Sequence, residues 1–134
     1  MKIKIAGIRR GNQYSPNHIG NDAAIFNLTV EHLVKRNCEI KEYTEEEFQT
    51  AQIDADLIFN MVRNTKSILK LQQQENQGKK VVNSGYGIEN CTRGKMTRLL
   101  LENNIPHPKS IIVLTDDKQF QDLESLGSHC WIKR

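Results

Sequence analysis

The chain has 134 residues, 37% hydrophobic and 26% charged, a composition typical of a globular domain with its own apolar core. The formal net charge of +3 is small and the basic residues are scattered. This argues against a nucleic-acid-binding protein, because such a protein gathers lysine and arginine on one face. No apolar run is long enough to span a membrane, and three widely spaced cysteines indicate reduced thiols, so we expect a cytoplasmic protein.

The first predicted elements are a buried strand over 3–8 and a polar loop over 11–21. Asn21 or Asp22 is placed to cap a helix from Ala23 that ends near Asn37, where asparagine tolerates the left-handed conformation. Its apolar residues recur at helical spacing and are Phe26, Val30, Leu33 and Val34.

A second strand is predicted over 39–43, and Thr44 with Glu47 has the spacing of a helix capping box. We interpret the acidic run 45–47 as a solvated helix start. An apolar strand over 56–62 is typical of a sheet covered on both faces.

A helix is predicted over 65–77, ended by Gly78, with a solvated glutamine run over 72–74. Its inner side is expected to carry Ile68, Leu69 and Leu71. A fourth strand follows over 79–83. The glycines in 85–87 indicate a tight turn.

Beyond a boundary near Asn90 we predict a helix over 93–103 and a strand over 110–115. A capped helix from Asp116 or Asp117 to about Gly127 and a strand over 130–133 complete this part. The whole pattern predicts an α/β fold, with a Rossmann-like, mostly parallel three-layer sheet in residues 1–90 and a smaller α+β lobe in 91–134. Tyr43, Phe59 and Trp131 are expected in packing roles.

Candidate ligand sites lie in the loops after the strands, because an open parallel sheet binds ligands beyond the carboxyl ends of its strands. The loop after the first strand is long and contains Arg9, Arg10, Ser15, Asn17 and His18. These residues, with the amides at the next helix start, are suited to hold an anion. The alternative is a turn-rich surface loop with two exposed arginines.

Two lysines are candidates for phosphate contacts. Lys95 lies near a helix start, where the helix dipole disfavours a cation unless an anion comes near. Lys133 follows Ile132 in an apolar strand pattern. The alternatives are a surface lysine and an ordinary chain end.

Four short segments follow one another along the second half of the chain: Val81-Val82-Asn83-Ser84, Arg93-Gly94-Lys95 with Leu99-Leu100, Ile105-Pro106-His107-Pro108, and Trp131-Ile132-Lys133. This succession resembles the N-terminal portion of ATP-grasp ligases. The resemblance points to the branch with ribosomal-protein glutamate ligases, glutathione synthetases and D-alanine–D-alanine ligases.

The resemblance implies that residues 1–90 are a pre-ATP-grasp domain and that 91–134 begin a truncated ATP-grasp lobe. Lys95 and Lys133 would then reach the nucleotide phosphates, with ATP and Mg²⁺ as cofactors of the complete protein. Arg9, Arg10, Ser15, Asn17 and His18 would lie near a small carboxylate or amine substrate. The family forms an acyl-phosphate that an amine or thiol attacks.

The sequence also departs from the family pattern. Gly94 replaces an acidic residue, Arg134 stands where proline is usual, and the glycine-rich loop and metal-binding set are absent. We therefore expect no catalysis from this chain alone, and a homo-oligomer is one open possibility. The alternative is a non-catalytic Rossmann-like module that binds a small anion or a protein partner. A receiver-like or flavodoxin-like regulatory domain is disfavoured, because no acidic cluster follows the first strand.

Overall fold

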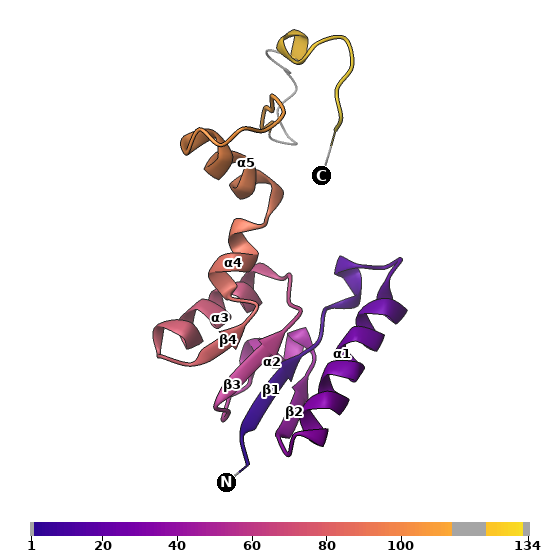
Figure 1. Cartoon of the computed structure of the whole chain (residues 1–134), viewed down its shortest axis with the longest axis vertical. Helices are drawn as coiled ribbons and strands as arrows, with labels where there is room; N and C mark the ends of the chain where they lie inside the picture. The colour runs from indigo at the N-terminus through magenta and orange to yellow at the C-terminus, as the bar shows by residue number, and fades with distance from the viewer. Residues whose placement is uncertain (1, 114–122, 133–134) are drawn as a thin grey trace. The chain divides into compact units, whose positions relative to one another are not determined.

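The computed structural model describes residues 2–113 and 123–132. The chain divides into two compact units, Met1–Glu89 and Asn90–Arg134 (Figure 1). The assignment of these units as a pre-ATP-grasp domain and the start of an ATP-grasp lobe stays a prediction.

The strands in the described ranges form one sheet of four parallel strands in the order β2-β1-β3-β4. Their bounds are β1 Lys4–Ile8, β2 Glu39–Tyr43, β3 Leu57–Asn60 and β4 Lys80–Val82. Each lies inside a predicted strand. The predicted parallel sheet is thus confirmed.

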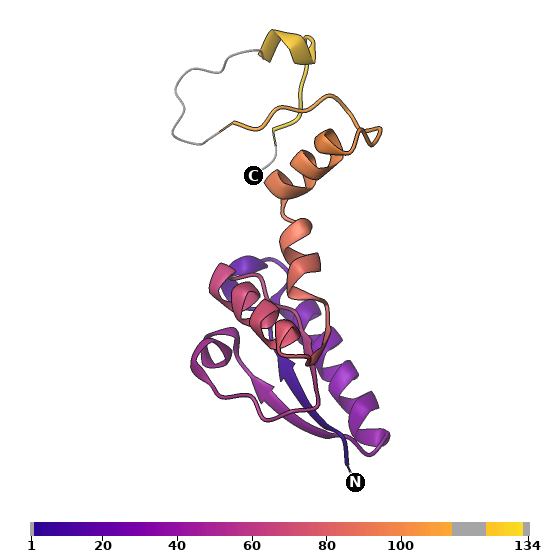
Figure 2. The ribbon, with the colours of Figure 1, turned by 90° about the vertical axis from the view of Figure 1, so that its left-hand side faces the viewer.

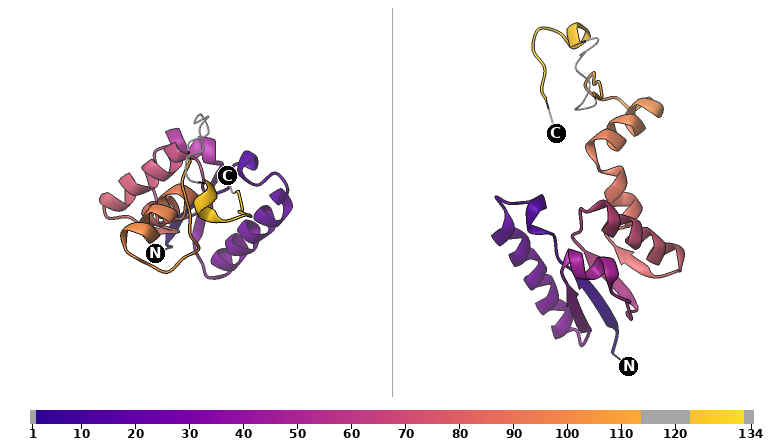
Figure 3. Two further views of the ribbon diagram at one scale, coloured as in Figure 1. Left: turned by 90° about the horizontal axis from the view of Figure 1, so that it is seen from above. Right: turned by 180° about the vertical axis from the view of Figure 1, so that it is seen from behind.

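Helices cover both faces of this sheet, as expected for a Rossmann-like α/β fold (Figures 1 and 2). The helix α1 (Ile19–Lys35) lies on one face, while α2 (Glu45–Thr50) and α3 (Thr65–Asn76) lie on the other. A single 3-10 turn, η1 (Asn12–Tyr14), precedes α1, and α4 (Gly85–Asn90) follows β4. The view from above in Figure 3 shows α1 and α3 on opposite sides of the strands.

The apolar core consists of two clusters, because successive strand residues point to opposite faces. Ile5 and Phe59 pack with Phe26 of α1, and the two phenylalanine ring centroids lie 5.0 Å apart. A Cβ atom on Gly7 would lie 2.7 Å from the Phe59 ring, so glycine is needed for this aromatic pair to lie close to β1. The cluster on the other face consists of Ala6, Ile8, Tyr43, Phe48, Ile53, Ile58, Val62, Ile68, Leu71 and Ile88.

The start of α1 differs from the prediction. The helix begins at Ile19, with His18 at the cap position, so neither Asn21 nor Asp22 caps it. Asp22 lies in the first turn, where its carboxylate pairs with Arg10. The predicted end is confirmed, since Asn37 follows the helix with a φ of 62°. Of the apolar residues at helical spacing, Phe26 is buried whereas Val34 is exposed.

The predicted turn at 85–87 is also wrong, because these residues begin α4. A Cβ atom on Gly85 would lie 2.9 Å from the backbone oxygen of Ile68, so this glycine permits close packing on α3. Gln72, expected to be solvated, is buried at the same contact and donates to the Glu89 carboxylate at 3.1 Å. On α3 itself, Leu69 is exposed rather than inward.

In the second unit, α5 (Arg93–Glu102) confirms the predicted helix, and Asn104 after it has a φ of 52°. Within the described part, residues 110–113 and 130–132 form no strand, so those two predictions are wrong there. The predicted helix start at Asp116 or Asp117 lies outside the described residues, and a short 3-10 helix, η2, spans Leu123–Leu126. Trp131 is 93% exposed and has no packing role, whereas Tyr43 and Phe59 are buried as predicted.

Candidate functional site

The sheet topology places the candidate site at the carboxyl ends of β1 and β3. The chain leaves β1 towards α1 on one face, and it leaves β3 towards α3 on the opposite face. The loops after these neighbouring strands therefore leave on opposite faces of the sheet, which defines a topological reversal point. In open α/β sheets this reversal point is the usual ligand site.

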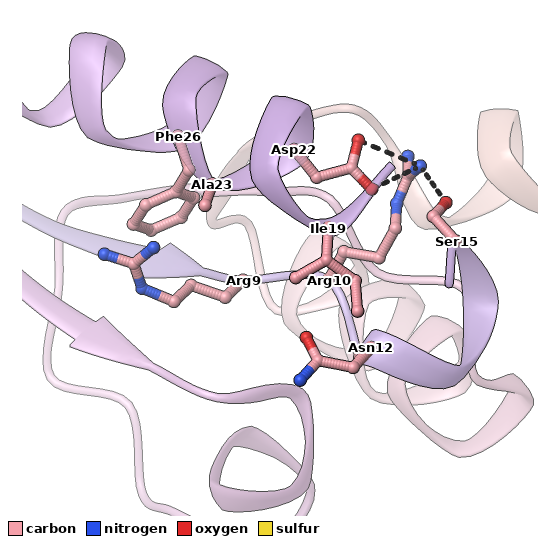
Figure 4. A pocket seen from close by; sticks show the side chains of 9 residues that line it. Arg9, Arg10, Asn12, Ser15, Ile19, Asp22, Ala23 and Phe26 are labelled. Carbon is pink, nitrogen blue, oxygen red and sulfur yellow. Dashed lines mark hydrogen bonds and ion pairs between the residues drawn. The ribbon is translucent and has the colours of Figure 1, made fainter. Parts of the chain in front are cut away.

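A small open cleft of about 70 Å³ lies beside this point (Figure 4). The loop after β1 and the first turns of α1 supply its walls. The lining residues are Arg9, Arg10, Gly11, Asn12, Ser15, Ile19, Asp22, Ala23 and Phe26.

Arg10 is the central cation of the cleft. Its Nη1 donates to the Ser15 hydroxyl at 2.9 Å and to the Asp22 carboxylate at 3.2 Å, and its Nε donates to the Met61 carbonyl at 3.2 Å. These bonds fix the guanidinium group between the loops that follow β1 and β3. The Nη2 atom makes no hydrogen bond with another residue in the described part, so it remains available as a donor.

Arg9 lies on the other side of the cleft and is held more fully. Its Nη2 donates to the Glu42 carboxylate at 2.6 Å and to the Asn27 side chain at 2.8 Å. The guanidinium carbon also stacks 4.2 Å above the centre of the Phe26 ring. Both arginines pair with a carboxylate, but Arg9 also has its flat face stacked on Phe26, so it shapes the cleft more than it offers a donor.

Glu45, at the start of α2, connects the loop after β1 to the loop after β3. Its carboxylate accepts the backbone N–H of Gly11 at 2.8 Å and that of Arg63 at 2.8 Å. The side chain is buried, which corrects the expectation that residues 45–47 are a solvated helix start. The capping box of Thr44 and Glu47 beside it is confirmed.

A pair of asparagines closes the neighbouring strand ends. Asn60, at the end of β3, donates to the carbonyls of Val82 and Asn83 at 2.9 and 2.8 Å. Asn83 donates back to the carbonyl of Asn60 at 2.7 Å and has a φ of 63°. The carboxyl ends of β3 and β4 are therefore held together by side-chain bonds where the ladder stops.

The structure brings together three of the five predicted substrate residues, Arg9, Arg10 and Ser15. Asn17 and His18 are exposed and do not line the cleft. Lys95 lies half-buried in the first turn of α5, in the second unit, and Lys133 lies outside the described residues.

Sequence reasoning missed the polar residues that hold the arginines. Asp22 was predicted to be a helix cap, and Glu45 was predicted to be solvated, yet each fixes part of the site. The burial of Glu45 leaves no pattern in the sequence, because its partners are backbone amides, which almost every residue has.

No protein-family model, curated protein or solved structure matches the chain. Among the residues that the structure describes, no group of three or more His, Cys, Asp or Glu side chains is arranged to hold a metal ion. In the same residues no helix is both long and apolar enough to cross a membrane.

Proposed function

We propose that residues 1–89 are the substrate-binding domain of an ATP-dependent carboxylate–amine or carboxylate–thiol ligase of the ATP-grasp type, and that residues 90–134 begin its nucleotide-binding lobe. The observation that carries the proposal is the arginine-lined cleft at the reversal point of the parallel sheet. The motif order from Val81 to Lys133 supports the ligase class.

The cleft suits a small carboxylate. The free Nη2 donor of Arg10 projects from a guanidinium group that three protein contacts already orient, so binding an anion costs little side-chain ordering. Arg9, which lines the same cleft, supplies a second guanidinium group. Asp22 offers a carboxylate for the amine end of an amino-acid-like substrate.

In the complete protein, ATP would supply a phosphoryl group to the substrate carboxylate with release of ADP. An amine or thiol would then attack the acyl carbon, lose its proton and displace inorganic phosphate. Lys95 and Lys133 would contact the nucleotide phosphates. The residues that the structure describes offer no site for Mg²⁺, so the proposal assigns no step to a metal held by them. Catalysis by this chain alone is not expected.

The first test is the coding sequence beyond the codon for Arg134. The proposal requires an open frame of about one more domain that encodes a glycine-rich loop and a late Glu/Asn metal set. An immediate stop codon would refute the ligase and leave the alternative, a non-catalytic module that binds a small anion or a protein partner.

The second test is a titration of the chain with L-glutamate, followed by NMR through backbone amides and arginine Nε–H signals. We expect shifts confined to the loops after β1 and β3, and Arg10→Gln should weaken binding by about 1.5–3 kcal/mol, because a charge-assisted bond is lost. Arg36→Gln, which changes an exposed arginine at the far end of α1, is the matched control. Binding of equal strength in both variants would remove Arg10 from the site.

A further inference from the structure

We propose that Glu45 is the positioning residue of the cleft: its carboxylate joins the loops after β1 and β3 into one unit and so sets the places of Arg10 and Arg63. This inference deepens the proposed function and rests on it for the identity of the site. The joining of the loops can be tested without any ligand.

The carboxylate is shared between the two loops. Oε2 accepts the backbone N–H of Gly11, which follows β1, at 2.8 Å. Oε1 accepts the N–H groups of Arg63 and Asn64, which follow β3, at 2.8 and 2.5 Å. Only 1% of the residue is exposed, so water does not replace these bonds. One side chain therefore satisfies three backbone donors from two loops.

An acceptor with two charged oxygens is needed at this position. The three N–H groups all point inward, and donors cannot bond to one another. An ionised carboxylate accepts through both oxygens, whereas a glutamine amide would place its own NH₂ donors against one of the loops. A buried donor without a partner is costly, so the loop that faces the NH₂ group would move away.

Gly11 is shaped to receive this carboxylate. A Cβ atom at Gly11 would lie 2.9 Å from the Glu45 Oε2 atom and 2.8 Å from the Gln13 Oε1 atom, which is closer than such atoms pack. The φ of Gly11 is −65°, a value open to every residue, so close approach rather than backbone conformation explains the glycine. Gly11 directly follows Arg10, and Glu45 therefore acts on the backbone next to the central cation.

The role of Glu45 is separate from holding α2 together. Thr44 and Glu47 form the capping box of that helix, with bonds of 2.8 and 3.1 Å, and Glu45 takes no part in it. Two other side-chain bonds join the loops, and each is single: the Asn64 side chain donates to the Tyr14 hydroxyl at 3.0 Å in an exposed position, and Arg10 Nε donates to the Met61 carbonyl at 3.2 Å in a partly buried one. Glu45 makes three bonds and is almost completely buried. The buried carboxylate is thus the main link.

The test uses the full chain with Glu45→Gln and Gly11→Ala, which disturb the same bond from its two sides. Glu46→Gln removes an exposed charge from the same turn, and Glu47→Ala weakens the capping box, so these two variants are the controls. Amide hydrogen exchange is measured at Gly11 and Arg63, and L-glutamate affinity is measured by NMR well below the unfolding temperature.

We expect Glu45→Gln to speed exchange at Gly11 and Arg63 together, and to weaken glutamate binding by about tenfold or more, as for the loss of a charge-assisted bond. Gly11→Ala should act in the same direction, and the double variant should be no worse than the stronger single one. Both controls should leave exchange at the two loops and the affinity unchanged.

The direction in which Glu45→Gln changes the affinity for L-glutamate distinguishes a positioning role of Glu45 from a purely electrostatic one. If Glu45 acted only through its negative charge, its neutralisation would strengthen anion binding. Stronger or unchanged binding in Glu45→Gln, or faster exchange in one loop alone, would overturn the proposal. Should Glu45→Gln fail to fold, Gly11→Ala alone decides by the same criteria. Absence of glutamate binding to the unaltered chain would contradict the proposed function, while the exchange data would still decide the role of Glu45.

Discussion

The two units of the chain differ in how far their residues satisfy one another. In the first, large apolar side chains such as Phe26 and Phe48 are almost completely buried, and charged or amide groups join one loop to the next. In the second, none of the residues of α5, all of them described, is buried. Apolar residues of the second unit are instead exposed, among them Leu101, Ile105 and Trp131.

The difference lies in the apolar core and the polar links of each unit. The first unit carries its own core and its own polar links, so its fold follows from its sequence. None of the described residues of the second unit is buried, so these residues form no apolar core of their own. A sequence can therefore have the apolar spacing of a helix without forming a buried core, as α5 shows.

The largest expected effect tests the core of the first unit. Phe48→Ala should destabilise the fold by about 3–5 kcal/mol, because it opens a cavity at a fully buried site. Leu101→Ala, a change on the exposed side of α5, should cost within about 0.5 kcal/mol. Urea unfolding measured by far-UV circular dichroism gives both values. Equal losses of stability in the two variants would show that the first unit depends on its apolar core no more than the second does.

The next prediction concerns binding of MgATP, the ligand proposed for the second unit. Lys95→Ala should weaken MgATP binding by about 1.5–3 kcal/mol, as should Lys133→Ala, if each lysine makes a charge-assisted bond to phosphate. Lys109→Ala, an exposed lysine of the same unit, is the control. Isothermal titration calorimetry provides the affinities, and unchanged binding in both variants would remove these lysines from a nucleotide site.

A third effect tests the polar links of the first unit. Asn60→Ala should cost about 1–3 kcal/mol, because the carbonyls of Val82 and Asn83 lose a buried donor. Gln73→Ala, on the exposed side of α3, should be near neutral. Thermal unfolding compares the two variants. An equally mild Asn60→Ala would show that these bonds do not hold the ends of β3 and β4.

Local patterns were sufficient to predict most elements of the first unit. Apolar runs predicted β1, β3 and β4, alternating polarity predicted β2, and the spacing of Thr44 and Glu47 predicted the start of α2. These signals succeed because they depend on neighbours in the sequence. The strand pattern over 110–113 failed within the described residues, since β-branched apolar residues alone do not supply a pairing partner.

The site was less predictable, because its contacts join residues distant in the sequence. The position of the cleft follows from strand order and loop length, and Arg9, Arg10 and Ser15 were found in that way. Burial of Glu45 was not, because it depends on amides 34 and 18 residues away, and an amide N–H is present at nearly every position. The glycine at 85 similarly serves a contact with α3 rather than a turn.

The smallest expected effect contrasts an exposed carboxylate with the buried one of Glu45. Asp54 accepts a bond from Lys4 Nζ at 2.8 Å, and this hydrogen bond and the lysine charge lower the pKa of Asp54 below its ordinary value of 3.8. A carboxyl whose pKa is lower in the folded state stabilises the fold above its unfolded pKa, and this stability is lost as pH falls through the folded pKa.

Asp54→Asn should lower Tm only slightly at neutral pH, because the Lys4–Asp54 pair is exposed to water. The difference from the unaltered chain should vanish in 1 M salt and at a pH below the folded pKa. If instead Asp54→Asn lowered Tm as much as Glu45→Gln, burial would not be what makes Glu45 important, and the distinction between surface pairs and loop links would fail.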